Sequence, residues 1–218
     1  MSINEDNKEN YVKTGTTTVG LVCKDGIVLA ADRRATAGYL IADKKAEKIH
    51  KINDRIALTM AGTVSDAQLL IRRLQAEVKL KEIRTYQETK VKEAANLMAQ
   101  LVYSNIRKFS SISGTTHFIM GGLDKTGFYL YDIYPDGSLM QYDDYLSSGS
   151  GSTFALGVLE TLYKKDLTVK EGVQLAIKAI NAALQRDIAT GNGVDVLTIT
   201  KEGVKKVFNQ SIETRVKQ

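Results

Sequence analysis

Length, composition and charge place this chain among ordinary globular proteins. It has 218 residues, of which 43% are hydrophobic and 25% are charged, so it is long enough to bury a core. No apolar run approaches the ~20 residues that a membrane-spanning helix needs, and the polar first ten residues do not resemble a secretory signal. We therefore expect no membrane association and a single soluble domain in the cytoplasm.

The formal net charge of +5 is spread along the chain rather than gathered in one place. Basic pairs such as Arg33-Arg34 and Lys205-Lys206 lack interleaved aromatic residues, whereas a nucleic-acid groove normally concentrates its cations on one element. We therefore expect no nucleic acid among the partners, and a basic nucleic-acid-binding module is the weakest alternative. The lone cysteine, Cys23, lies in an alternating apolar stretch and is predicted to belong to the core.

Hydrophobic patterns in chain order predict strands, two helices, further strands, two more helices and closing strands. The predicted strands are 17–23, 27–32, 56–62, 116–123, 127–133, 138–142, 194–200 and 204–208. The predicted helices carry apolar stripes at 67–78, 91–102, roughly 152–164 and 173–184. Ser65 with Gln68, and Thr168 with Glu171, stand in capping-box positions at the starts of the first and last helices.

This order of elements indicates antiparallel sheets with helices on their outer faces, because strict β-α-β alternation is missing. Two helix pairs need two sheet faces to cover. The predicted fold class is therefore α+β, a four-layer αββα sandwich of two antiparallel sheets flanked by helix pairs.

Few kinds of catalysis fit the residues present. His50 and His117 are the only histidines, they have no metal-ligand spacing, and no G-x-S-x-G elbow accompanies them. The glycine- and serine-rich segment 147–153 lacks the spacing of a dinucleotide fingerprint and is expected to be a flexible loop. We therefore expect no metal and no cofactor.

The segment Gly15-Thr16-Thr17-Thr18 allows a different chemistry, although its simplest interpretation is the start of a strand. A threonine hydroxyl is a weak nucleophile, but an N-terminal threonine carries its own base, an α-amine whose unperturbed pKa is ~8. Thr16 would have a free amine only after cleavage of the Gly15–Thr16 bond. Glycine suits that position because, without a Cβ, it leaves the carbonyl carbon open.

An ordered set of short motifs resembles the catalytic β subunit of the proteasome, most closely the archaeal type. The motifs are Gly15-Thr16-Thr17-Thr18-Val19-Gly20, Ala30-Ala31-Asp32-Arg33-Arg34, Lys48, Ala61-Gly62, Ser65-Asp66-Ala67-Gln68, Gly149-Ser150-Gly151-Ser152 and Gln185-Arg186-Asp187. They run in order over nearly all of residues 15–200. The resemblance implies the αββα fold of the N-terminal-nucleophile hydrolases. It also implies a threonine endopeptidase that degrades unfolded proteins to peptides inside a closed chamber.

The resemblance assigns the nucleophile to Thr16. In this family the threonine is freed when the precursor cleaves itself, here between Gly15 and Thr16. Residues 1–15 would then be a propeptide removed by autolysis, and 16–218 a single αββα hydrolase domain.

Further catalytic positions follow from the same motifs. Asp32 and Lys48 match the family's charged pair, in which Lys48 acts as a positive charge and proton relay near the nucleophile. Ser150 and Asp187 match the polar pair that holds the terminal amine and a nearby water. The backbone N–H of Gly62 matches the oxyanion donor.

One catalytic position departs from the family pattern. The family usually has a serine three residues after the aspartate, and this chain has Thr190. The hydroxyl is retained and one methyl group is added. We therefore expect Thr190 to serve in the catalytic set and activity to survive.

The resemblance also implies which residues line the primary specificity pocket. The matching positions are Ala35, Thr36, Ala46, His50, Met60, Val64 and Gln68. Met60 and two alanines indicate a roomy and mostly apolar pocket, with His50 as the polar exception. We therefore expect cleavage after large apolar residues.

The implied partners are proteasome α subunits and other β subunits in four stacked seven-membered rings, with a regulatory ATPase ring delivering unfolded protein. One alternative is an unprocessed, non-catalytic structural β subunit of the same particle. Another is the simpler bacterial threonine peptidase of two homohexameric rings. The Ser150 and Gln185-Arg186-Asp187 motifs favour the proteasome over that relative.

Overall fold

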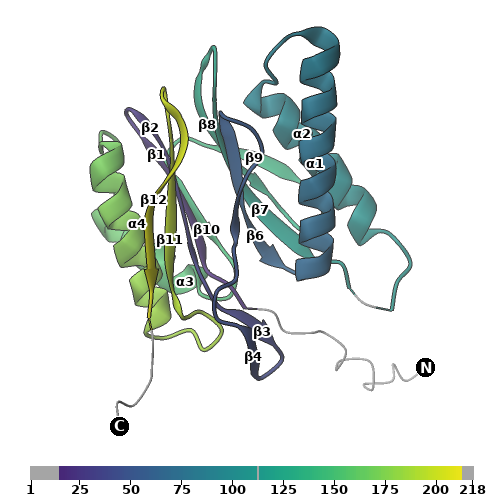
Figure 1. Cartoon of the computed structure of the whole chain (residues 1–218). Helices are drawn as coiled ribbons and strands as arrows, with labels where there is room; N and C mark the ends of the chain where they lie inside the picture. Colours follow the sequence, from purple (N-terminus) through teal and green to yellow (C-terminus); the bar gives the residue numbers. More distant parts are fainter. Residues whose placement is uncertain (1–14, 112, 213–218) are drawn as a thin grey trace, which may run out of the picture.

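The computed structural model describes residues 15–111 and 113–212. These residues form two five-stranded antiparallel sheets, a separate two-stranded hairpin and four helices (Figure 1). No helix within the described ranges is long and apolar enough to cross a membrane. Residues 1–14 of the expected propeptide lie outside the described part of the chain.

The first sheet has the strand order β10-β1-β2-β11-β12. Its strands are β1 (Thr18–Cys23), β2 (Gly26–Asp32), β10 (Tyr145–Ser148), β11 (Gly193–Thr200) and β12 (Gly203–Ser211). β1 and β2 form the predicted hairpin, in which Thr18 pairs with Ala31 and Cys23 with Gly26. Because these strands are antiparallel, the start of β1 lies beside the end of β2.

The second sheet has the strand order β5-β6-β7-β8-β9. Its strands are β5 (Ile49–Lys51), β6 (Ile56–Gly62), β7 (Thr116–Asp124), β8 (Gly127–Ile133) and β9 (Leu139–Tyr142). The small hairpin of β3 (Ala35–Ala37) and β4 (Leu40–Asp43) lies in the chain between β2 and β5, and it projects from the lower edge of the sandwich in Figure 1.

Helix pairs cover the outer faces of the two sheets (Figure 1). The helices are α1 (Val64–Thr85) and α2 (Val91–Ile106) on the second sheet, and α3 (Ser152–Leu162) and α4 (Val169–Leu184) on the first. The two sheets face each other through an apolar cluster that includes Ile27 of β2 and Ile119 of β7. The predicted αββα sandwich is confirmed.

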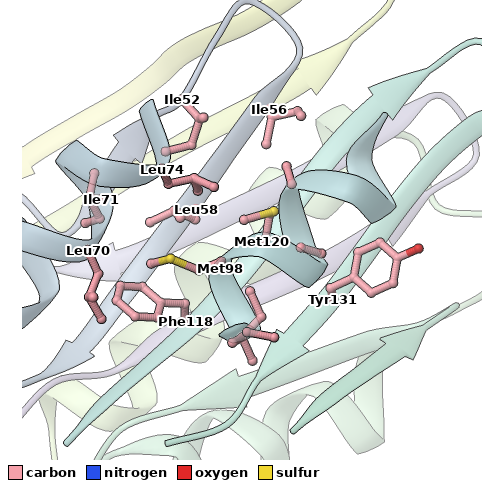
Figure 2. Close-up of a cluster of buried hydrophobic side chains, with 14 of the residues drawn as sticks. Ile52, Ile56, Leu58, Leu70, Ile71, Leu74, Met98, Phe118, Met120 and Tyr131 are labelled. Atoms are coloured by element: carbon pink, nitrogen blue, oxygen red, sulfur yellow. The ribbon is translucent and has the colours of Figure 1, made fainter. Parts of the chain in front are cut away.

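One core cluster lies between the second sheet and its helix pair, as Figure 2 shows. Leu70 and Leu74 of α1 and Met98 of α2 pack with Phe118 and Met120 of β7, and all five are buried. Burying a side chain of this size stabilises the fold by about 1.5–3 kcal/mol. The apolar stripes predicted for these two helices are therefore the faces that hold them on the sheet.

Only one of the two predicted capping boxes forms. The Thr168 hydroxyl accepts the backbone N–H of Glu171 at 3.3 Å, and the Glu171 carboxylate accepts the backbone N–H of Thr168 at 2.8 Å. The capping box of Ser65 and Gln68 was wrong. α1 already begins at Val64, which places Ser65 inside the first turn, where its hydroxyl has no cap position to fill.

The Gly/Ser segment 147–153 was predicted to be a flexible loop, and this was wrong. It ends β10, turns at Gly149 with a left-handed φ of +89°, and begins α3. The sequence patterns also missed the short strands β3, β4, β5 and β10. The prediction that Cys23 belongs to the core is confirmed, since it is buried beneath α4.

Candidate active site

Thr16 lies two residues before the start of β1, near the end of β2, and it is buried. Its hydroxyl donates a hydrogen bond to the carbonyl oxygen of Gly15 at 2.7 Å. The backbone N–H of Gly15 donates to Thr36 Oγ1 at 3.0 Å. The hydroxyl is therefore held against the peptide bond that the sequence analysis expects to be cut.

Lys48 and Asp32 form a buried ion pair next to this peptide bond. Lys48, which directly precedes β5, places Nζ 2.7 Å from Asp32 Oδ1 and donates to the Gly15 carbonyl oxygen at 3.4 Å. Asp32 also accepts three backbone N–H groups, those of Thr17 at 2.9 Å, Arg34 at 3.0 Å and Gly191 at 3.0 Å. Both carboxylate oxygens are thus satisfied, as a buried charge requires.

Burial sets the protonation chemistry of Lys48, whose side chain is 4% exposed. Loss of hydration lowers the pKa of its ammonium below the ordinary value, the Asp32 carboxylate opposes this shift, and the Arg34 charge adds to it. A lysine with a lowered pKa exchanges a proton near neutral pH more readily than an exposed one. Lys48 is therefore suited to proton transfer as well as to supplying charge.

A second polar network reaches the backbone of Thr16. Ser150 Oγ accepts the Thr16 backbone N–H at 3.3 Å and donates to Asp187 Oδ2 at 2.6 Å. Thr190 Oγ1 donates to the same carboxylate oxygen at 2.5 Å and shares a hydrogen bond with Thr17 Oγ1 at 2.6 Å. The structure thus brings Ser150, Asp187 and Thr190 together, and the extra methyl of Thr190 does not displace its hydroxyl.

Two glycines allow the backbone to approach Thr16 closely. A Cβ on Gly15 would lie 1.7 Å from the Cβ of Ala189, and a Cβ on Gly149 would lie 2.1 Å from the Thr16 carbonyl oxygen. Both distances are far inside van der Waals contact. A larger residue at either position would force Thr16 away from its partners.

A cavity of about 930 Å³ opens beside Thr16. All the residues expected in the specificity pocket line it, namely Ala35, Thr36, Ala46, His50, Met60, Val64 and Gln68. Gly62, at the end of β6 with φ +102°, lines the same cavity as the expected nucleophile. Lining residues that were not predicted from the sequence to be in the pocket include Asp43, Glu47, Ser113, Thr115 and His117.

The two histidines line this cavity, and within the described residues neither is hydrogen-bonded to the Thr16 network. His50 is partly buried, its Nε2 has no hydrogen-bond partner among the described residues, and burial lowers its pKa although Glu47 opposes the shift. His117 Nε2 instead pairs with Asp132 Oδ1 at 2.6 Å. No group of side chains suited to a metal ion occurs within residues 15–111 and 113–212.

Two groups that bind Asp32 were not predicted from the sequence. Arg34 follows Asp32 closely in the Ala30-Ala31-Asp32-Arg33-Arg34 motif, but the pair of arginines was considered only as part of the spread of basic charge along the chain. The N–H of Gly191 had no sequence signal, because its loop meets Asp32 only in the folded chain, 159 positions away.

Comparison with known proteins decides the family. The family model described as "Proteasome subunit" matches residues 12–199, which is most of the chain. The chain belongs to the proteasome family. It is a β subunit of the archaeal type, as its relatives show. It is therefore a subunit of the core particle, assembles with other proteasome subunits, and belongs to a family of proteases.

Three archaeal relatives, each named proteasome subunit beta, illustrate the similarity. The chain is 48% identical to the Ferroglobus placidus protein over 199 residues, which are 91% of this chain and 93% of that protein. It is 45% identical to the Methanocaldococcus vulcanius protein over 199 residues, 91% and 87% of the two chains. It is 42% identical to the Methanococcus maripaludis strain C5 protein over 219 residues, 100% and 98% of the two chains.

Proposed function

We propose that this β subunit is an active threonine endopeptidase of the proteasome core particle, with Thr16 as its nucleophile. One observation carries the proposal: Thr16 Oγ1 and Lys48 Nζ both donate to the carbonyl oxygen of Gly15. A purely structural subunit has no need of a buried Lys48–Asp32 pair at that bond, because buried ion pairs add little net stability.

The first step of the proposed mechanism is self-cleavage. The Thr16 oxygen attacks the carbonyl carbon of Gly15, and the Lys48 ammonium stabilises the negative charge that develops on the carbonyl oxygen. The carbon–nitrogen bond breaks, and the nitrogen takes up the proton that the Thr16 hydroxyl loses in the attack, so that it becomes the α-amine of Thr16. Water then hydrolyses the remaining ester, which releases residues 1–15 and restores the hydroxyl.

The second step applies the same hydroxyl to a substrate carbonyl. The new α-amine starts from a nitrogen that lies 3.3 Å from Ser150 Oγ, so Ser150 and its partner Asp187 are placed to hold it. We assign proton transfer to this amine and Lys48, and oxyanion stabilisation to the backbone N–H of Gly62. Thr190 keeps the Asp187 carboxylate in position.

The cavity beside Thr16 supports a preference for large apolar residues before the cut. Met60, Val64 and the alanines supply apolar walls, and the lowered pKa of His50 favours a neutral side chain there. Glu47, which also lines the cavity, opposes the lowering of the His50 pKa by burial. We therefore expect little attraction for acidic substrate side chains, which Glu47 would repel.

A panel of fluorogenic peptides tests both the nucleophile and the preference. Wild-type particles should cleave peptides ending in Leu or Tyr at least tenfold faster than peptides ending in Arg or Glu. Thr16→Ala particles should cleave none, whereas Thr16→Ser, which keeps a hydroxyl, should retain measurable activity. Normal activity in Thr16→Ala would contradict the mechanism, and faster cleavage after Glu would contradict the preference.

The proposed setting is a closed chamber in the cytoplasm. Two seven-membered rings of β subunits would stack between rings of α subunits, and a regulatory ATPase ring would feed in unfolded protein. A protease with broad preference needs such confinement to spare folded proteins. The non-catalytic structural subunit remains the alternative outcome of the peptide assay.

A further inference from the structure

The guanidinium of Arg34 bridges the end of β2 and the loop 188–192, which precedes β11. Its Nε donates to Asn192 Oδ1 at 2.9 Å, and its Nη1 donates to the carbonyl oxygen of Ile188 at 2.8 Å. Between these two anchor points the loop passes directly over the guanidinium, because a Cβ on Gly191 would lie 2.2 Å from its central carbon. Arg34 therefore holds both ends of the loop.

This loop supplies two of the contacts that organise the catalytic groups. The first is the Gly191 N–H, which donates to Asp32 Oδ2 at 3.0 Å. The backbone N–H of Arg34, outside the loop, donates to the same oxygen at 3.0 Å. Thr190 in the loop donates to Asp187 Oδ2 at 2.5 Å. A shift of the loop would therefore disturb Asp32, the partner of Lys48, and Asp187 together.

The loop is exposed at its start and buried at Thr190 and Gly191. Ile188 is 86% exposed, so its side chain does not anchor the loop in the core. A second cavity, of about 480 Å³, is lined by Arg34 together with Asp187, Thr190, Gly191 and other loop residues. Backbone bonds also hold the loop, since the Arg33 N–H donates to the Gly191 carbonyl oxygen at 3.1 Å and the Ile212 N–H donates to the Asn192 carbonyl oxygen at 3.1 Å. On the side that faces this cavity, the bonds from the Arg34 side chain hold the loop at Ile188 and Asn192.

We propose that Arg34 is a positioning residue for catalysis, whose guanidinium holds the loop 188–192 so that Gly191 stays bonded to Asp32 and Thr190 to Asp187. The inference rests on the proposed threonine-peptidase function. The proposed role requires arginine in particular. A planar guanidinium can bond both Asn192 Oδ1 and the Ile188 carbonyl oxygen, whereas a lysine ammonium cannot reach both acceptors with the same geometry.

The neighbouring arginine provides a matched control. Arg33 follows the same strand and is also partly buried, but its guanidinium faces β12, where Nη1 donates to Ser211 Oγ at 2.7 Å and to Asn209 Oδ1 at 3.3 Å. Arg33 Nε lies 3.7 Å from Asp195 Oδ2. Removing this guanidinium disturbs the sheet edge and leaves the side-chain bonds of Arg34 to the loop in place.

The test compares assembled particles of the wild type with Arg34→Gln, Arg34→Lys and Arg33→Gln, using a peptide ending in Leu. Arg34→Gln should lower kcat at least tenfold with KM changed less than twofold, because the substrate cavity is not lined by Arg34. The kcat of Arg34→Lys should lie between those of Arg34→Gln and the wild type. Arg33→Gln should keep kcat within twofold of the wild-type value. An unchanged kcat in Arg34→Gln, or an equal loss in Arg33→Gln, would overturn the proposal.

A second variant removes the acceptor instead of the donor. Asn192 has a left-handed φ of +63°, which glycine also adopts without strain, so Asn192→Gly deletes Oδ1 while keeping the turn. Its kcat should also fall, and the double variant with Arg34→Gln should lose less than the product of the two single losses. Fully multiplicative losses would show that the two side chains act separately.

Cryo-electron microscopy of Arg34→Gln particles separates this inference from the proposed function. The distance between the Gly191 nitrogen and Asp32 Oδ2 should lengthen beyond hydrogen-bond range, whether or not the wild type hydrolyses peptides. An unmoved loop would refute the positioning role. An inactive wild type with a displaced loop in the variant would instead refute the peptidase proposal and leave the role of Arg34 standing.

Discussion

Lys48 combines a buried position, a carboxylate partner and contact with the Gly15 carbonyl. If charge alone were needed at this place, arginine would serve, yet arginine stays protonated in proteins and cannot relay a proton. We expect Lys48→Arg and Lys48→Ala each to reduce peptide hydrolysis by 10²-fold or more, the range typical of a lost acid–base group. Particle assembly and melting temperature serve as folding controls. Near-normal activity in Lys48→Arg would exclude the relay role.

Thr190 tests whether the network needs the hydroxyl or the shape of its side chain. Thr190→Ser keeps the bond to Asp187 and restores the residue usual in the family, so its activity should stay within about threefold of the wild type. Thr190→Val keeps the shape but removes one of the hydrogen bonds to Asp187 and leaves the buried Thr17 hydroxyl without its partner, which costs about 1–3 kcal/mol. Activity should therefore fall markedly in Thr190→Val only. Equal activity in the two variants, measured by peptide hydrolysis, would contradict the network.

At the scale of elements, the capping box of α4 offers a local measurement. Thr168→Ala removes a hydroxyl cap worth ~1 kcal/mol, so amide hydrogen exchange in the first turn of α4 should speed up by about fivefold. Ser65→Ala is the matched control, since Ser65 lies inside the first turn of α1 and caps nothing. Unchanged exchange in Thr168→Ala, or an equal acceleration in α1 of Ser65→Ala, would contradict the assigned helix start.

Most elements could be predicted from the sequence because long strands and helices carry a strong period. The stripe of α4 and the β1–β2 hairpin are examples, since their apolar positions repeat over many residues. β3 and β5 were missed because each has only three residues, too few to show alternation. Their position depends on neighbouring strands rather than on their own pattern.

The site was predictable to the extent that its residues sit in local motifs. Thr16, Asp32 and Lys48 were named from such motifs, and the structure brings them together. Arg34 was missed as a positioning candidate because its partners, Ile188 and Asn192, lie more than 150 positions away along the chain. Side-chain bonds over that separation follow from the fold and leave no spacing in the sequence to detect.

At the scale of the whole molecule, both sheets contribute to one site. The first sheet supplies Thr16 just before β1 and Asp32 at the end of β2, while the second sheet supplies Lys48 before β5 and Gly62 at the end of β6. The cluster between the sheets, which includes Ile27 and Ile119, fixes their relative position. The geometry of the candidate site and the stability of the sandwich are therefore coupled through the same interface.

The central claim is that the folded chain uncovers its own nucleophile. The most direct measurement is the intact mass of this chain recovered from particles assembled with α subunits. The account predicts a loss equal to residues 1–15, which leaves Thr16 as the first residue, and no loss in Thr16→Ala particles. A full-length mass in complete wild-type particles would contradict the account and identify a non-catalytic ring subunit.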